Sequence, residues 1–242
     1  GKSGSNSLNI FANPRALPEV YYDNNVINAP GAIEVSRDNI NPVIDVAFDG
    51  QYILDGDIVS ATPLISVKVK DENPFLFKTD TTGVNIILRP PCENWVIERI
   101  SFASDEVEWF SANEDEDFSV EYKPTTLADG IYSFRVEAND ASGNESGVEP
   151  YLVNFEVINE STVTNFYPYP NPFSTSTKFV FTLTGSDIPD EIKIQIMTVS
   201  GKIVREITQD ELGVVRIGNN ISDYAWDGKD EYGDQLANGV YL

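Results

Sequence analysis

The chain has 242 residues and carries 39 acidic against 16 basic side chains, a formal net charge of −23. A field of that sign repels nucleic acid and anionic membrane surfaces, so we expect neither as a partner. Hydrophobic residues make up 41% and aromatic residues 11%, which excludes global disorder, and the length predicts two or three small domains. No stretch approaches the roughly 20 apolar residues of a membrane-spanning helix, so we expect no membrane insertion.

The first 40 residues are rich in Asn, Pro and Gly. Pro14, Pro18 and Pro30 exclude a central strand running through this region. We interpret residues 1–40 as a linker and the tail of a preceding domain, with one edge strand packing against the next domain. No secretory leader is visible in them, so an exported protein would carry its signal upstream of Gly1, and the chain would be a piece of a longer protein.

Seven short apolar segments occur within residues 41–160, separated by turn residues such as Asp-Gly and Asn-Pro. We predict strands at 43–48, 64–69, 84–88, 95–102, 118–122, 131–138 and 151–158. Alternation is cleanest at 131–138, where Tyr132, Phe134, Val136 and Ala138 share one face that should be core. Short strands punctuated in this way predict a β-sandwich.

A second, smaller sandwich is predicted at 163–242. Residues 169–173 read Tyr-Pro-Asn-Pro-Phe, and their prolines predict a rigid extended bend into a strand at 177–184. That strand places Phe179, Phe181 and Leu183 on one apolar face. Residues 192–197 and 203–207 then alternate on either side of a tight turn, which predicts an antiparallel hairpin.

The order of four sequence pieces in this region resembles the C-terminal sorting domain of type IX secretion substrates in Bacteroidota-type bacteria. The pieces are Tyr-Pro-Asn-Pro-Phe, a hairpin turning on Gly-Lys, Trp-Asp-Gly-x-Asp-x-x-Gly and Asn-Gly-Val-Tyr. The resemblance implies an immunoglobulin-like domain that the export machinery reads as a folded signal and that a sortase often removes. Its signal residues would be Pro170, Asn171, Pro172, Phe173, Gly201, Lys202, Trp226, Asp227, Gly228, Gly239 and Tyr241.

Two further features qualify this resemblance. The family usually continues a few residues past the final Tyr, commonly with a basic residue, whereas this sequence stops at Leu242, so we expect the last part of the signal to lie beyond it. The hook-capping protein of bacterial flagella carries a similar Trp-Asp-Gly module, which is a competing resemblance.

The first sandwich carries a resemblance of its own. Residues 127–144 resemble bacterial immunoglobulin-like and fibronectin-like surface domains, which usually act as spacers. In such folds a tyrosine near the start of a late strand often bonds back to the backbone, and Tyr132 is the candidate for this tyrosine corner. Together with residues 52–57, the two domains also resemble the region behind the peptidase domain of gingipain-like cysteine peptidases.

The sequence contains few of the residues that catalysis usually requires. The chain contains no histidine, so Ser-His and Cys-His activation are unavailable within it, and its lone cysteine, Cys92, has no intrachain disulfide partner. Paired carboxylates could serve glycoside hydrolysis, but the clusters at 105–106, 114–117 and 210–211 are typical of solvated loops in an acidic chain. We expect no enzyme activity from this chain.

Ligand binding is the more credible chemistry. No cofactor is predicted, but loop oxygens could bind calcium, which prefers carboxylate and carbonyl ligands. The candidate pairs are Asp55 with Asp57, Asp140 with Asn144, and Asp227 with Asp230, and each could equally serve to form its turn. Sugar binding would need an exposed indole; Trp95 and Trp109 are candidates, whereas Trp226 is expected to pack inside the sorting motif.

These observations predict an all-β chain of two tandem immunoglobulin-like antiparallel sandwiches, a spacer at 41–160 and a sorting domain at 163–242. The expected protein is exported to the cell surface or the medium, with the type IX machinery and its sortase as partners. Two alternatives stay open. One is a carbohydrate- or calcium-dependent adhesion module, and the other is an accessory region of a gingipain-like peptidase whose catalytic domain lies upstream.

Overall fold

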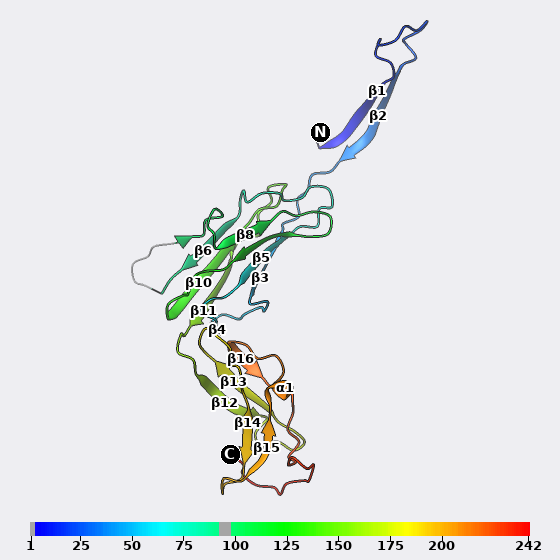
Figure 1. Ribbon diagram of the computed structural model, residues 1–242. Coiled ribbons are helices and arrows are strands. Elements are labelled where there is room, and N and C mark those ends of the chain that lie inside the picture. The colour runs from blue at the N-terminus through cyan, green and yellow to red at the C-terminus, as the bar shows by residue number, and fades with distance from the viewer. Residues whose placement is uncertain (1–2, 92–97) are drawn as a thin grey trace. The chain divides into compact units, whose positions relative to one another are not determined.

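The computed structural model describes residues 3–91 and 98–242, and the regular secondary structure of these residues is almost entirely β-strand (Figure 1). The predicted all-β class with antiparallel sheets is therefore confirmed. The elements are β1 (Gly4–Phe11), β2 (Val26–Val35), β3 (Val43–Phe48), β4 (Asp57–Val59), β5 (Ile65–Lys70), β6 (Asn85–Arg89), β7 (Glu98–Arg99), β8 (Val107–Phe110), β9 (Phe118–Tyr122), β10 (Gly130–Glu137), β11 (Tyr151–Val157), β12 (Val163–Tyr169), β13 (Lys178–Leu183), β14 (Ile194–Met197), β15 (Ile203–Ile207), α1 (Gln209–Leu212) and β16 (Gly218–Ile221). Within the described ranges, no helix has the length and apolar character needed to cross a membrane.

Packing divides the chain into two compact units, Gly1–Asn41 and Pro42–Leu242. The first contains an antiparallel hairpin of β1 and β2, although the sequence predicted a linker and tail with one edge strand. Its prolines explain the difference. Pro14 and Pro18 lie in the connection between the strands, and Pro30 lies where the pairing register shifts, so none of them interrupts a regular ladder.

The second unit begins with a sandwich of two sheets, ordered β4-β11-β10-β6-β7 and β3-β5-β9-β8 (Figure 1). Neighbouring strands pair antiparallel except β4 and β11, which pair parallel. The two inner faces meet around Phe48, whose ring centroid lies 5.7 Å from that of Phe134 and 5.1 Å from that of Phe155. Aromatic pairs at this spacing add to the stabilisation that burial alone provides.

The predicted core face of β10 is confirmed. The exposed fractions of Tyr132, Phe134, Val136 and Ala138 are 4%, 0%, 0% and 1%. Tyr132 also stacks on Phe155 at 5.4 Å between centroids. The sequence missed β4 and β8, and only Glu98–Arg99 of the strand predicted at 95–102 is a strand, with residues 92–97 outside the described part of the chain.

The C-terminal sandwich has its own core. One sheet is ordered β12-β13-β16, and the hairpin β14-β15 forms the second layer. Phe179, Phe181 and Leu183 on β13 are buried, as predicted from their alternation. They cluster with Ile207 on β15 and with Trp226, which is only 4% exposed.

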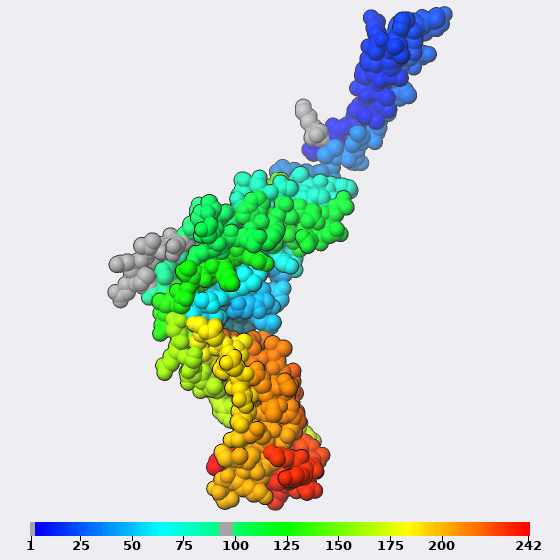
Figure 2. Space-filling model, in the orientation of Figure 1, coloured from blue at the N-terminus to red at the C-terminus, as the bar shows by residue number. Residues whose placement is uncertain are grey.

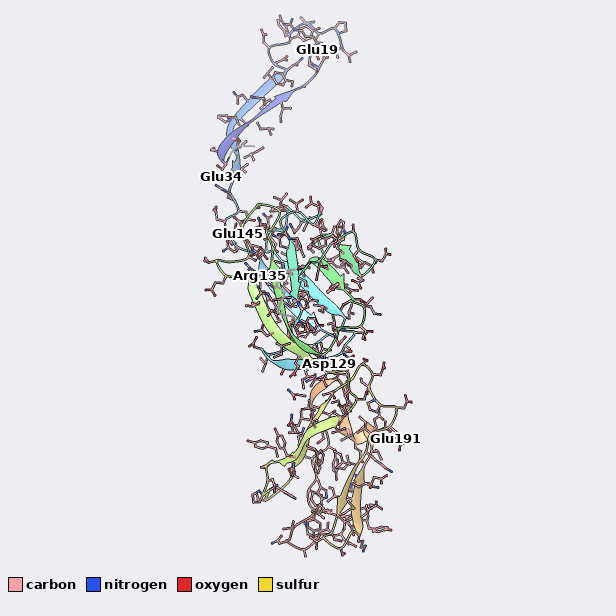
Figure 3. All side chains as sticks on the ribbon, turned by 90° about the vertical axis from the view of Figure 1, so that its left-hand side faces the viewer. Glu19, Glu34, Asp129, Arg135, Glu145 and Glu191 are labelled. Atoms are coloured by element: carbon pink, nitrogen blue, oxygen red, sulfur yellow. The ribbon has the colours of Figure 1, made fainter. Side chains whose placement is uncertain are left out.

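The chain passes between the two sandwiches through residues 158–162, which are held at both ends. Asn159 donates its backbone N–H to Asp129 Oδ1 at 2.6 Å, and the Gly185 N–H donates to the Ile158 carbonyl at 2.8 Å. Figure 3 labels Asp129 at the point where the first sandwich meets the second. The connection is therefore bonded to the end of each sandwich.

A direct contact joins β16 to the β4 edge of the first sandwich. A Cβ atom placed on Gly218 would lie 2.4 Å from the Ile58 carbonyl oxygen, so only glycine fits there. Arg216 Nη1 donates to Gln51 Oε1 at 2.8 Å beside it. Because backbone meets backbone without an intervening side chain, this contact fixes the spacing between the two edges.

Candidate recognition site

The Pro-Asn-Pro-Phe segment forms the bend between β12 and β13. The sequence predicted a bend that leads into one strand. In the structure a strand, β12, also precedes the bend and pairs antiparallel with β13, so the segment turns the chain back on itself. The Pro170 carbonyl accepts a hydrogen bond from Thr177 Oγ1 at 2.8 Å. Thr177 in turn exchanges two backbone hydrogen bonds with Trp226, at 2.8 and 2.9 Å. This bridge brings the first and third of the four motif pieces together.

An aromatic row links three of the four motif pieces. The ring centroid of Trp226 lies 5.5 Å from that of Phe173 and 5.7 Å from that of Tyr241. The indole Nε1 donates to the Lys229 carbonyl at 2.8 Å, and the Tyr241 hydroxyl donates to the Ala237 carbonyl at 2.7 Å. The buried Trp226 therefore packs the fold, as the sequence predicted for this indole.

The Trp-Asp-Gly piece is a turn stabilised by its own side chains. Asp227 Oδ2 forms an ion pair with Lys229 Nζ at 2.8 Å. The hydrogen bond from Lys229 lowers the pKa of Asp227, and the same contact raises the pKa of Lys229. Gly228 has a φ of +80° and sits against the Gln235 side chain, 3.2 Å from where a Cβ would lie. The turn therefore requires glycine at this position.

The Gly201-Lys202 piece lies at the exposed tip of the β14-β15 hairpin. Gly201 has a φ of +84°, and the Thr198 N–H donates to the Lys202 carbonyl at 2.9 Å to close the turn. Thr198 also bridges Tyr241. Figure 2 shows the last residues in red beside this hairpin in gold and orange. All four motif pieces therefore gather at one end of the C-terminal sandwich.

An apolar groove of about 550 Å³ opens between the two layers at this end. Its lining includes Phe166 and Phe179 from one sheet, Ile196 from the other, and Trp226 and Leu242. Phe166 stacks on Phe179 at 6.0 Å between centroids and yet is 50% exposed. The sequence analysis did not identify Phe166 or Leu242 as site residues, because neither belongs to the four motif pieces.

The first two calcium candidates fall in a turn beside β4 and act there as hydrogen-bond acceptors. Asp55 Oδ1 accepts from the backbone and side-chain nitrogens of Asn154, both at 2.8 Å. Asp57 Oδ2 accepts from the Leu54 N–H at 2.8 Å, and its Oδ1 accepts from Asn219 Nδ2 at 3.3 Å. Both carboxylates therefore have structural partners.

The other candidates behave in the same way. Asp140 accepts from the Asn144 N–H at 2.8 Å and from Asn144 Nδ2 at 2.7 Å, and it is only 4% exposed. Asp230 Oδ1 accepts from the backbone of Tyr232 and Asp234, both at 2.9 Å. Of the five aspartates, including Asp227, none belongs to a cluster of three metal-ligating side chains within the described residues. Calcium binding stays a prediction.

Of the two tryptophan candidates for sugar binding, only Trp109 lies within the described residues. Trp109 lies on the edge strand β8, is 39% exposed and stacks on Phe118 at 6.1 Å between centroids. Trp95 and Cys92 lie outside the described residues. A partly exposed indole on an edge strand is compatible with sugar stacking, but no second aromatic ring contacts its outer face among the described ring pairs.

A repeated six-residue pattern was also missed. Residues 127–132 read Leu-Ala-Asp-Gly-Ile-Tyr and residues 236–241 read Leu-Ala-Asn-Gly-Val-Tyr. The predicted bond of Tyr132 is present, because its hydroxyl donates to the Ala128 carbonyl at 3.1 Å, and Tyr241 makes the same bond four residues back. Comparing the two halves of the sequence would have revealed this pattern.

Comparison with known proteins gives limited information. No family model matches the chain, and no curated protein matches it. Among solved structures, the chain is similar to the crystal structure of dimeric latent PorU from Porphyromonas gingivalis, with 18% sequence identity and a TM-score of 0.38. The match covers 90% of this chain and 20% of PorU, so the chain spans about one fifth of that protein's length.

Proposed function

We propose that this chain is a non-catalytic C-terminal region of an exported bacterial surface or secreted protein. The sandwich at 41–160 is an immunoglobulin-like spacer. The sandwich at 163–242 is a folded sorting signal that the type IX export machinery reads and that a sortase removes.

The observation that supports this proposal is the gathering of the four ordered motif pieces at one end of the C-terminal sandwich. Phe173, Trp226 and Tyr241 form one aromatic row, and the bridge between Thr198 and Tyr241 brings the Gly201-Lys202 tip to the same end. Pieces spread over residues 169–241 thus create one local surface, which is what recognition of a folded shape requires.

The motif residues divide by role in this proposal. Trp226 and Gly228 are buried and maintain the surface, whereas Lys202 is exposed at the hairpin tip. A buried residue cannot contact a receptor without unfolding. The exposed motif residues are Pro170, Asn171, Pro172, Gly201, Lys202 and Gly239. Lys202 is the charged one among them, so we propose it for direct recognition.

An export assay tests the proposal. A periplasmically targeted fluorescent protein is fused to the N-terminus of the whole chain, together with any codons that follow Leu242 in its gene, and expressed in a type IX-competent host. We expect the reporter at the surface or in the medium, and its loss from there in a secretion-deficient host. Retention of a folded, protease-resistant fusion in the periplasm would exclude the sorting role.

Charge reversal at the hairpin tip tests the division of roles. Lys202→Glu should reduce export, while Lys123→Glu, at another exposed lysine in the first sandwich, should leave it unchanged. Equal export of both variants would remove Lys202 from the recognition surface.

A further inference from the structure

The strand β8 of the first sandwich has an open outer edge. Among the described strands it pairs only with β9, at one end of the sheet order β3-β5-β9-β8. The Lys123 N–H donates to the Glu106 carbonyl at 2.8 Å on the β9 side. Because antiparallel ladders alternate, Glu108 also pairs with β9, and the N–H and C=O of Trp109 point away from it. β8 lies in the middle of the sequence, between two described segments, so this edge is internal to the chain.

Two aromatic side chains flank this open edge, one on each face of the sheet. Trp109 is 39% exposed and stacks on the completely buried Phe118, so its ring covers the side of the core. Phe110 lies opposite Ser119 on the outer face and is 43% exposed. Exposed apolar side chains beside unpaired backbone groups are the arrangement that accepts an added strand.

The outer face of the same edge carries an excess of negative charge. Residues 101–122 contain eight acidic side chains and no basic one. Glu108 lies directly opposite Glu121 across the ladder, and like charges in that position are unfavourable. Among the described residues, neither carboxylate forms an ion pair. A basic side chain placed beside Glu108 would therefore find a favourable position.

The other neighbour of β9 shows which kind of strand fits this acidic face. β5 alternates two buried valines, Val67 and Val69, with two exposed lysines, Lys68 and Lys70. Lys68 lies opposite Ser119, which places it diagonally from Glu121 on the outer face. β9 thus has a strand of alternating apolar and basic residues on one side, and on its other side β8 leaves an acidic edge open.

We propose that the outer edge of β8 binds an extended strand of a partner protein in which basic residues alternate with apolar ones. Its basic side chains lie on the outer face beside Glu108, and its apolar side chains lie beside Trp109, because successive side chains of a strand point to opposite faces. Pairing between two copies of β8 would bring two acidic edges together, which disfavours a second copy as the occupant. This role gives a binding surface to the sandwich proposed as a spacer and does not depend on the sorting function.

Peptide binding to the full 242-residue chain tests the chemistry of the occupant. The probe is a fluorescent peptide with blocked ends and the sequence of residues 65–70, Ile-Ser-Val-Lys-Val-Lys. One control peptide carries Lys68→Glu and Lys70→Glu, and the other has the probe's residues in the order Ile-Val-Val-Ser-Lys-Lys. In fluorescence anisotropy we expect the probe to bind at least about tenfold more tightly than either control. Equal binding of the acidic control would overturn the charge requirement, and equal binding of the rearranged control would overturn strand addition.

Substitution at Trp109 tests the strand edge itself. Trp109→Pro removes the outward N–H, and proline is tolerated on an edge strand when that N–H faces solvent. Trp109→Val keeps the N–H, and both variants lose the indole ring, so they are matched. The proline variant should bind the probe at least about fivefold more weakly than the valine variant. Equal binding by a folded proline variant would exclude strand addition at β8.

Charge reversal at Glu108 covers the case in which the proline variant does not fold. Glu108→Lys removes the like-charge pair with Glu121, so the sandwich should stay folded while probe affinity falls roughly fivefold. Glu231→Lys, at an exposed residue of the C-terminal sandwich, changes the total charge equally and should leave probe affinity nearly unchanged. Equal losses in the two variants would show that the probe responds to total charge, and would overturn the proposal.

Light scattering identifies the remaining occupant, a second copy. We expect the chain without peptide to be monomeric through this edge, so that Trp109→Pro does not change its mass in solution. A dimer that Trp109→Pro dissociates, from a chain that ignores the probe, would assign the edge to self-association and overturn the proposal.

Discussion

The two sandwiches contain a similar run of six residues that ends in a tyrosine, yet that tyrosine lies in different surroundings in each. Tyr132 is 4% exposed and stacks on Phe155, whereas Tyr241 is partly exposed and meets Trp226 edge-on. The local hydrogen bond is common to both. A short motif can therefore determine the local tyrosine hydrogen bond, while the packing around the ring is set by the rest of each sandwich.

Truncating the core strand of the first sandwich should have the largest effect. Phe134→Ala removes a completely buried ring that contacts Phe48, and we expect the free energy of unfolding to fall by about 3–5 kcal/mol. Urea denaturation measures the change. A loss below about 1 kcal/mol would mean that the core closes around the missing ring and that β10 does not dominate this sandwich.

The second largest loss of stability should come from disrupting the contact between the two sandwiches. Gly218→Ala places a methyl group against the Ile58 carbonyl at a φ of +95°, so we expect a loss of about 1–3 kcal/mol and faster hydrogen exchange in β13 and β16. Gly201→Ala is the matched control, because Gly201 has a similar φ of +84° and open space around it. Equal effects of the two substitutions would show that backbone strain alone, without the clash, explains the loss.

Removing the tyrosine hydroxyls tests whether the same local hydrogen bond contributes differently to stability in the two sandwiches. Tyr132→Phe should cost about 0.5–1.5 kcal/mol, because it deletes one hydrogen bond from a side chain that is largely shielded from water. Tyr241→Phe should cost less, since water can replace the bond at the exposed Ala237 carbonyl. Thermal or urea unfolding of both variants gives the two values. The reverse order would mean that the C-terminal sandwich relies more on its local bond than on packing.

The smallest expected effect is a dependence of stability on pH that comes from Asp129. This residue is the third of the six-residue pattern in the first sandwich, and Asn238 takes its place in the C-terminal sandwich. The hydrogen bond from the Asn159 backbone lowers the pKa of Asp129. A lowered folded-state pKa stabilises the protein above the unfolded pKa of about 3.9, and this stabilisation is lost as pH falls through the folded value. The stability difference between wild type and Asp129→Asn should therefore be present at pH 7 and vanish in strong acid, as followed by urea midpoints. A difference independent of pH would exclude this carboxylate as its source.

The sequence predicted the strands that alternate and missed those that do not. β9 and β10 have one apolar face toward the core, and their period of two is visible in the residues. The missed β12 is exposed at most positions and contains Pro168, and the missed β16 reads Gly-Asn-Asn-Ile. β12 buries little on either face, and the buried positions of β16 are Gly218 and Asn220 and not apolar side chains. Tertiary pairing and not an apolar pattern therefore determines both strands.

The sequence allowed the motif residues of the candidate site to be listed, but not their arrangement in space. The order of residues identified the four pieces, and packing preferences correctly predicted that Trp226 is buried. That Thr198 would bridge Tyr241, or that Phe166 would cover an apolar groove, depends on which strands become neighbours. Long-range pairing of this kind leaves no local signal.

The short connection at 158–162 has a mechanical consequence. A pull on the C-terminal sandwich would load the bond between Gly185 and Ile158, and from there the Asn159–Asp129 bond at the start of β10. Tension would thus pass directly into the central ladder of the first sandwich, since there is no slack loop to extend first. The backbone hydrogen bonds between β10 and β11 would then carry the load.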